Sequence, residues 1–394
     1  MARRPGNPMT SSKRILTTHA GSLPRPQRLV QLYAYRVNGE PIDEDALAAE
    51  GDEATRAVVA RQREVGIDVP SDGEQVREGF FLYVQRRMSG FGGRWTRRPS
   101  REFDSYPEFA EVRRQALATT KGVTNFSPPM AIGPVRYEDR AANAAEIEGF
   151  RTALAAAGDE FADAFITAPS PGIVAMAMKN DYYPDDEAYL HDVAEALKVE
   201  YEAAIAAGLM LQIDAPDLAL ERHLTYADRP VADFVGFVDR VVATINKAIA
   251  GLPRERIRLH VCWGNYEGPH DHDVPLRDIL PSILAADVGT YMMPFANPRH
   301  QHEIKVFRDI PLKKHQSLIV GCVDTQTAYV EHPEVVADRL ERAAEMVGDP
   351  ARIQAGTDCG FDTSAGMGRV TSDVVWAKLR SLREGADIAA GRLF

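Results

Sequence analysis

The sequence predicts an α/β protein: a single (β/α)8 TIM barrel with an insertion after strand 2. Short apolar runs alternate with stretches long enough for helices, a pattern that favours right-handed βαβ units. There are eight such runs, and eight units favour a closed barrel over an open sheet. We expect strands at Ile15–Ser22, Ile67–Asp72, Phe165–Ala168, Met210–Asp214, Ile257–Cys262, Thr290–Met293, Leu318–Val323 and Ile353–Thr357.

Two of the expected helices have clear boundaries. Apolar residues recur every three or four positions over 187–208, and Gly208 closes that segment. A second helix is expected over 332–348, where Pro333 suits the first turn and Gly348 suits a C-terminal cap.

The remaining segments divide the chain into a tail, a barrel and an insertion. Residues 1–13 are basic and lack a long apolar run, so we expect a disordered tail rather than a secretory signal. Residues 14–394 form the predicted barrel domain. The stretch at about 78–149 is too long for one crossover, and we interpret it as the insertion.

Composition narrows the classes of function. The 394 residues are 45% hydrophobic and carry a formal net charge of -11, which argues against nucleic acid or an anionic membrane as a partner. No apolar stretch approaches the roughly 20 residues that span a bilayer. The three cysteines do not form a dense even set, so we expect a reducing, cytoplasmic location rather than disulfides.

Polar residues gather where the predicted strands end. In a barrel this is the face at which active sites lie, since the loops after the strands meet there. The residues concerned are His19, Ser22, Asp72, Glu74, Asp214, His260, Cys262, Asp324, Asp358 and Cys359.

His260 and Cys262 are the first metal candidates. Alternate residues of a strand point to the same side, so the imidazole and the thiol would face one point. Cys359, after the last predicted strand, would bring a second thiol to the barrel mouth. Two sulfurs and one imidazole suit Zn²⁺ with an open fourth position, as in a catalytic site. The alternative is that Cys359 is a small buried hydrophobe.

Two nearby segments contain further histidines and acids. For "WGNYEGPHDHD" we prefer a solvated acidic loop, although Glu267, His270, Asp271, His272 and Asp273 are all capable ligands. In "NPRHQHE", the side chains of His300, His302 and Glu303 could hydrogen-bond to the site or cap a helix.

Several ordered motifs resemble a known family. "TTHAGSLPRP", "LQIDAP", "HVCWGN" and "TDCGF" resemble, in this order, the catalytic barrel of the cobalamin-independent methionine synthases. "SDGEQVREGFF" and "FANPRHQHE" are more similar to the single-barrel relatives, which include the epoxyalkane:coenzyme M transferases. The resemblance extends over nearly the whole chain after the tail.

The resemblance implies a zinc-dependent transferase that activates a substrate thiol as a zinc-bound thiolate for alkylation. Its zinc ligands would be His260, Cys262 and Cys359. Asp214 and Glu74 would hold the ammonium group of an amino-acid thiol such as homocysteine.

Further residues are candidates for binding the substrates or for transferring a proton. Ser22 and His19 lie in the segment that faces the methyl donor, and they are the further substrate-binding candidates. Asp324, which the resemblance retains after strand seven, is a catalytic candidate. His300 is a second candidate, since epoxide opening needs a proton for the leaving alkoxide, which either His300 or a zinc-bound water could supply.

The sequence departs from the family at two positions. The family's fourth zinc ligand is a Glu at the end of strand six, where this chain has Met292, Met293 and Pro294; Glu303 is the nearest acid downstream and a candidate replacement. A family His after strand seven is replaced by Gln326, which cannot transfer a proton near pH 7.

Three hypotheses for function follow. The first is methyl transfer to a small-molecule thiol, with methyltetrahydrofolate as a candidate alkyl donor. The second is an epoxyalkane:coenzyme M-type alkyl transfer. The third, from another class, is a non-catalytic zinc-binding barrel. A homo-oligomer is compatible with each of them.

Overall fold

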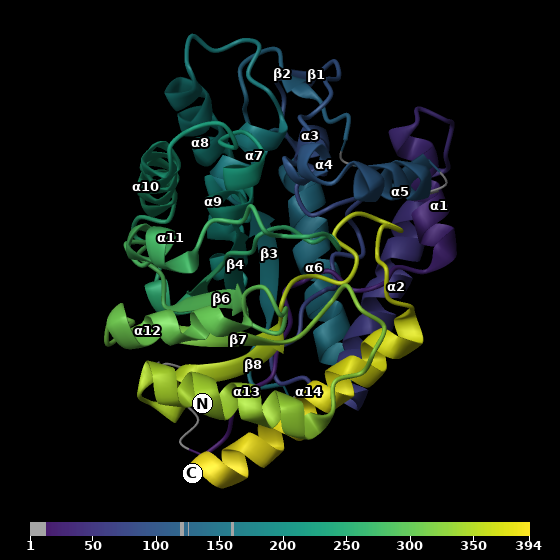
Figure 1. Cartoon of the computed structure of the whole chain (residues 1–394). Coiled ribbons are helices and arrows are strands. Elements are labelled where there is room, and N and C mark those ends of the chain that lie inside the picture. Colours follow the sequence, from purple (N-terminus) through teal and green to yellow (C-terminus); the bar gives the residue numbers. More distant parts are fainter. Residues whose placement is uncertain (1–12, 119–121, 125, 159–160) are drawn as a thin grey trace.

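The computed structural model describes residues 13–118, 122–124, 126–158 and 161–394, so the predicted tail 1–13 lies outside them except for Lys13. A parallel sheet is surrounded by helices (Figure 1). Its six strands follow one another in chain order: β3 (Phe165–Pro169), β4 (Met210–Asp214), β5 (Ile257–His260), β6 (Thr290–Pro294), β7 (Ser317–Val323) and β8 (Ile353–Thr357).

Two extended segments connect the edges of this sheet. They cover the first two predicted strands, and the pairing of Thr17 with Ala355 is an isolated parallel bridge rather than a longer ladder. Backbone hydrogen bonds nevertheless run from β8 to β3 through both segments: Thr18 N–H to Ala355 O (2.9 Å), Val69 N–H to Thr17 O (3.0 Å) and Phe165 N–H to Pro70 O (3.0 Å). Six of the eight predicted strands are thus strands, and the other two segments complete the ring.

The strands lie in the core. All residues of β3, β4, β5, β6 and β8 are buried. Parallel strands that are covered on both faces are expected to be apolar along most of their length, as these are. The polar residues of interest therefore stand out at the carboxyl ends, where each strand gives way to a loop.

Helices follow the strands around the ring (Figure 1). The α-helices outside the segment 78–139 are α1 (Gln27–Val37), α2 (Glu44–Glu64), α6 (Arg140–Ala157), α7 (Pro171–Ala177), α8 (Asp186–Ala206), α9 (Asp217–Leu220), α10 (Val231–Ala248), α11 (Leu276–Ile283), α12 (Val306–Asp309), α13 (Pro333–Val347) and α14 (Ser372–Leu393). Four short 3-10 helices are η1 (Glu221–His223), η2 (Arg254–Arg256), η3 (Gln301–Lys305) and η4 (Pro350–Arg352).

Both predicted helix boundaries agree with the structure. Helix α8 is capped by Asp185, whose side chain accepts a hydrogen bond from the Ala188 N–H at 2.8 Å. Helix α13 begins at Pro333 and is followed by Gly348 in the left-handed conformation, with φ of 81°.

The segment predicted as an insertion lies over the loops that follow the strands. It contains α3 (Val84–Arg87), β1 (Phe91–Gly92), α4 (Glu102–Ser105), α5 (Pro107–Ala118) and β2 (Met130–Ala131), and then the first part of α6. The Arg101 N–H donates to the His223 carbonyl at 3.1 Å, after β4. The Tyr106 hydroxyl donates to Asp271 at 2.6 Å, after β5. The segment thus covers the mouth of the barrel.

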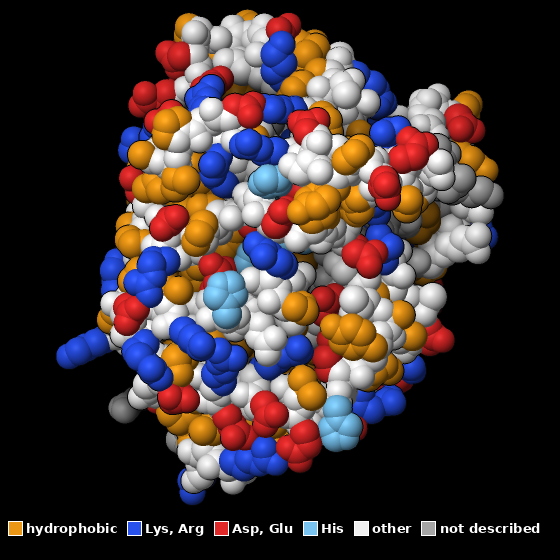
Figure 2. Space-filling view, in the orientation of Figure 1, with side chains coloured by type: hydrophobic (Ala, Val, Ile, Leu, Met, Phe, Trp, Pro, Cys, Tyr) orange, Lys and Arg blue, Asp and Glu red, His pale blue; other side chains and the backbone are white. Residues whose placement is uncertain are grey.

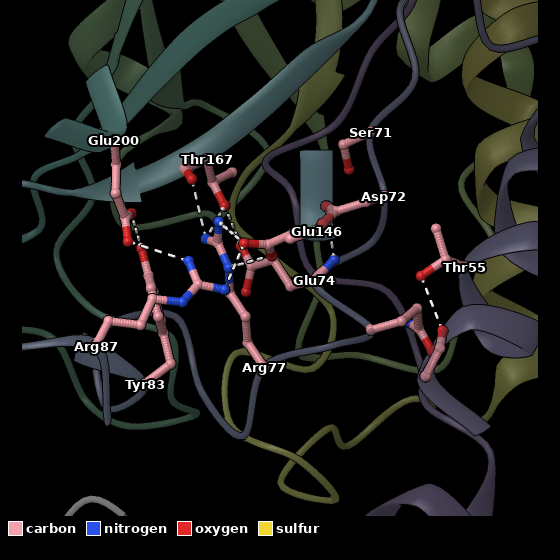
Figure 3. Close-up of polar contacts among 12 residues, drawn as sticks. Thr55, Ser71, Asp72, Glu74, Arg77, Tyr83, Arg87, Glu146, Thr167 and Glu200 are labelled. Atoms are coloured by element: carbon pink, nitrogen blue, oxygen red, sulfur yellow. Dashed lines mark hydrogen bonds and ion pairs between the residues drawn. The ribbon is translucent and has the colours of Figure 1, made fainter. Parts of the chain in front are cut away.

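A buried ion-pair network fixes the beginning of this segment to the barrel (Figure 3). Arg77 donates to Glu146 at 2.6 Å, Arg87 donates to the same carboxylate at 2.7 Å, and Arg87 also donates to Glu200 at 3.0 Å. Glu146 lies on α6 and Glu200 on α8. Removing Glu146 would leave two buried guanidinium groups without this partner, a loss of about 3–5 kcal/mol.

The outer surface mixes charges of both signs. Figure 2 shows acidic and basic side chains interspersed over the viewed face. Among the described residues, no helix has the length and apolar composition needed to cross a membrane.

Candidate metal centre

Three side chains meet at the carboxyl ends of β5 and β8. We call His260, Cys262 and Cys359 the thiol cluster; all three are buried and their ligand atoms lie within 4.8 Å of one another. The two sulfurs are 3.8 Å apart, far beyond the roughly 2.05 Å of a disulfide bond. The structure thus brings together the three predicted ligands, which come from positions 97 residues apart in the chain.

The spacing of the thiol cluster fits a tetrahedral zinc ion. Two sulfurs, each about 2.3 Å from one metal at the tetrahedral angle, would be about 3.8 Å apart, and this is the separation found between Cys262 and Cys359. The Nε2 atom of His260 is buried without a hydrogen-bond partner. A buried nitrogen rarely stays unpaired, so a ligand role explains it better than packing does.

The electrostatics of the cluster favour a thiolate. The pKa of Cys262 lies well below its usual range because Cys359 can hydrogen-bond to its sulfur and His260 lies beside it. Burial disfavours the charged ring of His260, yet the hydrogen bond to Asp214 and the nearby Cys262 raise its pKa to about 10. A metal cation bound by the thiol cluster would replace the protons that His260 and the thiols otherwise share.

Asp214 holds the ring of His260. Residues 214 and 260 are paired across β4 and β5. The His260 Nδ1–H donates to Asp214 Oδ1 at 2.9 Å, and Gln212 donates to the same oxygen at 2.8 Å. This contact leaves His260 Nε2 free toward the two sulfurs, the arrangement that orients many metal-bound histidines.

Glu74, predicted to bind substrate, lies buried near Asp214. Its Oε1 accepts from the Thr167 hydroxyl at 3.1 Å, while its Oε2 has no partner (Figure 3). Burial, and then the charge of Asp214, raise the pKa of Glu74 to about 8. Its φ of 56° is in the left-handed region, which costs energy for a side chain of this kind. An ammonium group would satisfy its free oxygen.

His19 and Ser22 are engaged within the protein. The His19 Nε2–H donates to Gln62 at 2.7 Å and its Nδ1 accepts from the Gly21 N–H at 3.2 Å, so both ring nitrogens have partners. Burial lowers the pKa of His19 to about 4, which keeps the ring neutral. The Ser22 hydroxyl accepts from the Asp362 N–H at 3.3 Å. Both side chains are thus held by contacts within the protein.

The loop after β7 lines the pocket over the thiol cluster. Asp324 Oδ1 accepts from the backbone N–H groups of Gln326 (2.6 Å) and Thr327 (3.1 Å), which shapes this loop. Gln326 lines the same pocket as Cys262, and its Oε1 is buried without a partner. This part of the pocket thus presents a neutral amide.

No described carboxylate joins the thiol cluster. At the end of β6, residues 292–294 are buried and supply none. Glu303 lies instead with His300, whose Nδ1 is 2.8 Å from its Oε2, and its Oε1 accepts from the Leu276 N–H at 2.6 Å. Asp358, next to Cys359 in the chain, accepts from three backbone N–H groups of the loop after β6.

A second cluster lies at the same pocket, which His270 and His300 line. We call His223, His270, His300 and Asp273 the imidazole cluster. Asp273 contacts all three rings: His223 Nδ1 and His300 Nε2 at 2.8 Å, and His270 Nδ1 at 2.9 Å. All four side chains are buried, so the predicted solvated loop is wrong for His270 and Asp273, although Glu267 is exposed.

Sequence patterns gave little sign of the imidazole cluster. Its members come from the loops after β4, β5 and β6. His223 lies nine residues after Asp214, the last residue of β4, and this spacing is not typical of a metal ligand. Only the number of histidines in the segments after β5 and β6 pointed toward it.

Comparison with known proteins identifies the family to which this chain belongs. Residues 104–386 match the family model described as the catalytic domain of cobalamin-independent synthase. A methionine synthase from Thermococcus kodakarensis is 27% identical over 381 residues, which cover 96% of this chain and 94% of that protein. One from Pyrococcus horikoshii is 26% identical over 349 residues, or 88% and 86% of the two chains.

Solved structures support the fold. A B12-independent methionine synthase from a Shewanella species, in complex with selenomethionine, superposes with a TM-score of 0.71 at 22% identity and covers 96% of this chain and 99% of its own. A putative vitamin-B12 independent methionine synthase from Listeria monocytogenes gives 0.63 at 19% identity, covering 95% and 99%. The predicted fold class is confirmed.

Proposed function

Since this chain belongs to the cobalamin-independent synthase family, we propose that it is a zinc-dependent transferase that methylates a small-molecule thiol. The single observation that carries the proposal is the thiol cluster, with its sulfur separation of 3.8 Å and its unpaired His260 nitrogen. Three protein ligands leave one tetrahedral position for the substrate sulfur. Zinc, when bound, would lower the pKa of that thiol and favour its nucleophilic form.

The acceptor that fits best is an amino-acid thiol of the homocysteine kind. The free oxygen of Glu74 is buried, and Glu74 lies close enough to Asp214, the partner of His260, for that charge to raise its pKa. A buried carboxyl group of this type is stabilised by a cationic partner, and an α-ammonium group supplies one. The methionine synthases among the relatives agree with such an acceptor.

The protein residues around the pocket restrict how the donor binds. Asn265 donates to the Gly360 carbonyl at 2.9 Å and accepts from Thr325 at 3.2 Å, so the loops after β5, β7 and β8 are joined across the opening. A methyl donor must enter past this bridge. Methyltetrahydrofolate is our candidate donor.

The test is metal analysis combined with X-ray absorption at the zinc edge. Protein prepared in metal-free buffer and reloaded with Zn²⁺ should hold about one zinc per chain, and the zinc should gain one sulfur ligand when homocysteine is added. Protein that binds no zinc would refute the proposal. Zinc that gains sulfur from a thiol without an amine, but not from homocysteine, would favour the epoxide-type alkyl transfer instead.

Two variants separate the roles of the acidic residues. Glu74→Gln should weaken binding of homocysteine by about 10-fold or more and leave the binding of a thiol without an amine unchanged, because only the ammonium contact is lost. Asp214→Ala should weaken the binding of both thiols, since it also releases His260. If Glu74→Gln weakened the binding of both thiols equally, Glu74 would not be the contact for the amine.

A further inference from the structure

The imidazole cluster contains more hydrogen-bond acceptors than neutral histidines can serve. His300 Nδ1 lies 2.8 Å from Glu303 Oε2, and its Nε2 lies 2.8 Å from Asp273 Oδ2. Ionised carboxylates only accept hydrogen bonds, so the ring must donate from both nitrogens. A ring that donates from both nitrogens is an imidazolium.

His270 likewise has a hydrogen-bond acceptor at each of its two ring nitrogens. Its Nδ1 lies 2.9 Å from Asp273 Oδ2 and its Nε2 lies 3.0 Å from the carbonyl oxygen of Tyr266. Its backbone φ of 55° is left-handed, and its N–H donates to Glu102 at 2.5 Å. Strained backbone that is held by several contacts is concentrated at functional sites.

The charges around the two rings balance within the protein. Asp273, Glu303 and Glu102 are the acidic groups that face them. Arg299 donates to the His270 carbonyl oxygen at 3.0 Å. Burial disfavours the charged ring of His300, but the hydrogen bonds to Asp273 and Glu303 raise its pKa to about 9, and the pKa of His270 is also raised. His223, the third ring, contacts the other oxygen of Asp273 and the Tyr266 hydroxyl.

The imidazolium rings line the pocket that also contains Cys262 and Cys359. His300 stacks on Trp263, the residue after Cys262, with ring centroids 4.1 Å apart. Two other polar side chains that line this pocket are weaker candidates for the proton donor. Gln326 is an amide. Burial raises the pKa of Asp358 to about 7, but its two oxygens accept three backbone N–H groups, which favour its ionised form.

We propose that His300 is the proton donor to the leaving group of the alkyl donor, and that Asp273 and Glu303 position it. The inference rests on the proposed thiol alkylation. The substrate sulfur forms a bond to carbon while the bond from that carbon to a nitrogen or oxygen of the donor breaks. The electron pair of the broken bond goes to the nitrogen or oxygen. That atom then takes the proton of His300 Nε2, which otherwise forms the hydrogen bond to Asp273. The neutral ring then regains a proton from water.

This assignment defines the class of donor. A nitrogen or oxygen leaving group of high basicity needs a proton, whereas a halide or a sulfide does not. The enzyme should therefore use a tertiary amine such as a reduced pterin, or an epoxide, and gain nothing from His300 with methyl iodide.

The kinetic test compares His300→Gln with wild type on two donors. With the nitrogen or oxygen donor that wild type uses, kcat should fall by about 100-fold or more, because general acids contribute 10²–10⁴-fold. Methyl transfer from methyl iodide to homocysteine should change by less than about threefold. His302→Gln, an exposed residue two positions away, is the matched control and should leave both rates unchanged.

The pH profile supplies a second readout. Wild-type kcat with the nitrogen or oxygen donor should fall as pH rises through about 9, while the methyl iodide rate should not fall there. Equal losses of both activities in His300→Gln would indicate a structural role and overturn the assignment. No transfer by wild type with either donor would refute the proposed function itself.

Protonation can be observed without activity. In zinc-loaded protein with ¹⁵N-labelled histidine, two rings should show two N–H groups each at pH 7.5, and one such ring should be missing in His300→Gln. Neutral rings would overturn the inference. A second metal ion that disappears in His300→Gln would also overturn it, because a metal would then hold the cluster in place of protons.

Discussion

The thiol cluster and the imidazole cluster face the same pocket but differ in what completes them. In the thiol cluster, His260 has one nitrogen on Asp214 and one without a partner, next to two sulfurs. In the imidazole cluster, both nitrogens of His300 face carboxylates. The first arrangement leaves one ring nitrogen free to bind a metal, whereas the second pairs both ring nitrogens with acceptors.

This difference shows that residue type alone does not identify a metal site. Each cluster places histidine beside aspartate at 2.8–2.9 Å. What separates them is the balance of donors and acceptors, since a ring nitrogen without a partner is available to a metal and a ring between two acceptors carries two protons.

The largest expected effect comes from removing a sulfur. Cys262→Ser or Cys359→Ser should lower zinc affinity by about 10³-fold or more and abolish thiol alkylation, a larger loss than the 10–100-fold of an outer contact. Elemental analysis and an activity assay measure this. A variant that remains fully metallated and active would mean that the thiol cluster is ordinary packing.

A smaller effect is expected at Asp214. Asp214→Ala removes the hydrogen bond that orients His260, so zinc affinity should fall by about 10–100-fold in competition with a chelator. His300→Gln should leave zinc affinity unchanged, because its partners belong to the other cluster. If both variants lost zinc equally, the two clusters would be one metal site.

The imidazole cluster predicts a pH dependence of stability. The pKa of His300 in the folded protein, about 9, lies above the 6.5 expected when unfolded. Its ion pairs therefore contribute fully below about pH 6.5, and the contribution is lost as pH rises through about 9. Between these values the free energy of unfolding should decrease by about 1–3 kcal/mol more in wild type than in His300→Gln. Urea denaturation at several pH values measures it, with His302→Gln behaving as wild type.

The smallest effect is expected at the third cysteine. Cys322 is buried within β7, and its sulfur contacts the Val320 carbonyl oxygen at 3.3 Å rather than either cluster. Cys322→Ala should leave zinc content unchanged and lower the free energy of unfolding by about 1 kcal/mol, the typical effect of one point substitution. If this variant lost zinc, Cys322 would not be a mere packing residue and could not be distinguished in this way from Cys262 and Cys359.

The sequence predicted the fold and the thiol cluster because both depend on local patterns. Alternation of apolar runs and helices identifies βαβ units, and the positions of Cys262 and Cys359 follow from where their strands end. The predicted strands Ile15–Ser22 and Ile67–Asp72 were wrong as strands, because these segments pair through an isolated bridge and single hydrogen bonds rather than a ladder.

The imidazole cluster was not predictable in the same way. Its members lie on loops, whose course depends on tertiary contacts such as that between Glu102 and the backbone of His270. Neither does sequence show that Asp214 contacts His260, since that depends on register between β4 and β5. Burial decides whether a histidine-rich loop is solvated or functional, and burial is a property of the whole fold.

The closure of the ring also has a consequence for biosynthesis. The segment that contains Ala20 is synthesised early, yet its hydrogen-bonding partner Thr357 lies 337 residues later. At about 5–20 residues per second, translation of that stretch takes roughly 20–70 s. During this time the segment that contains Thr17 and Thr18 lacks its neighbour β8, and Cys359 does not yet exist in the chain. Binding of the proposed zinc by all three ligands would therefore have to follow translation of β8.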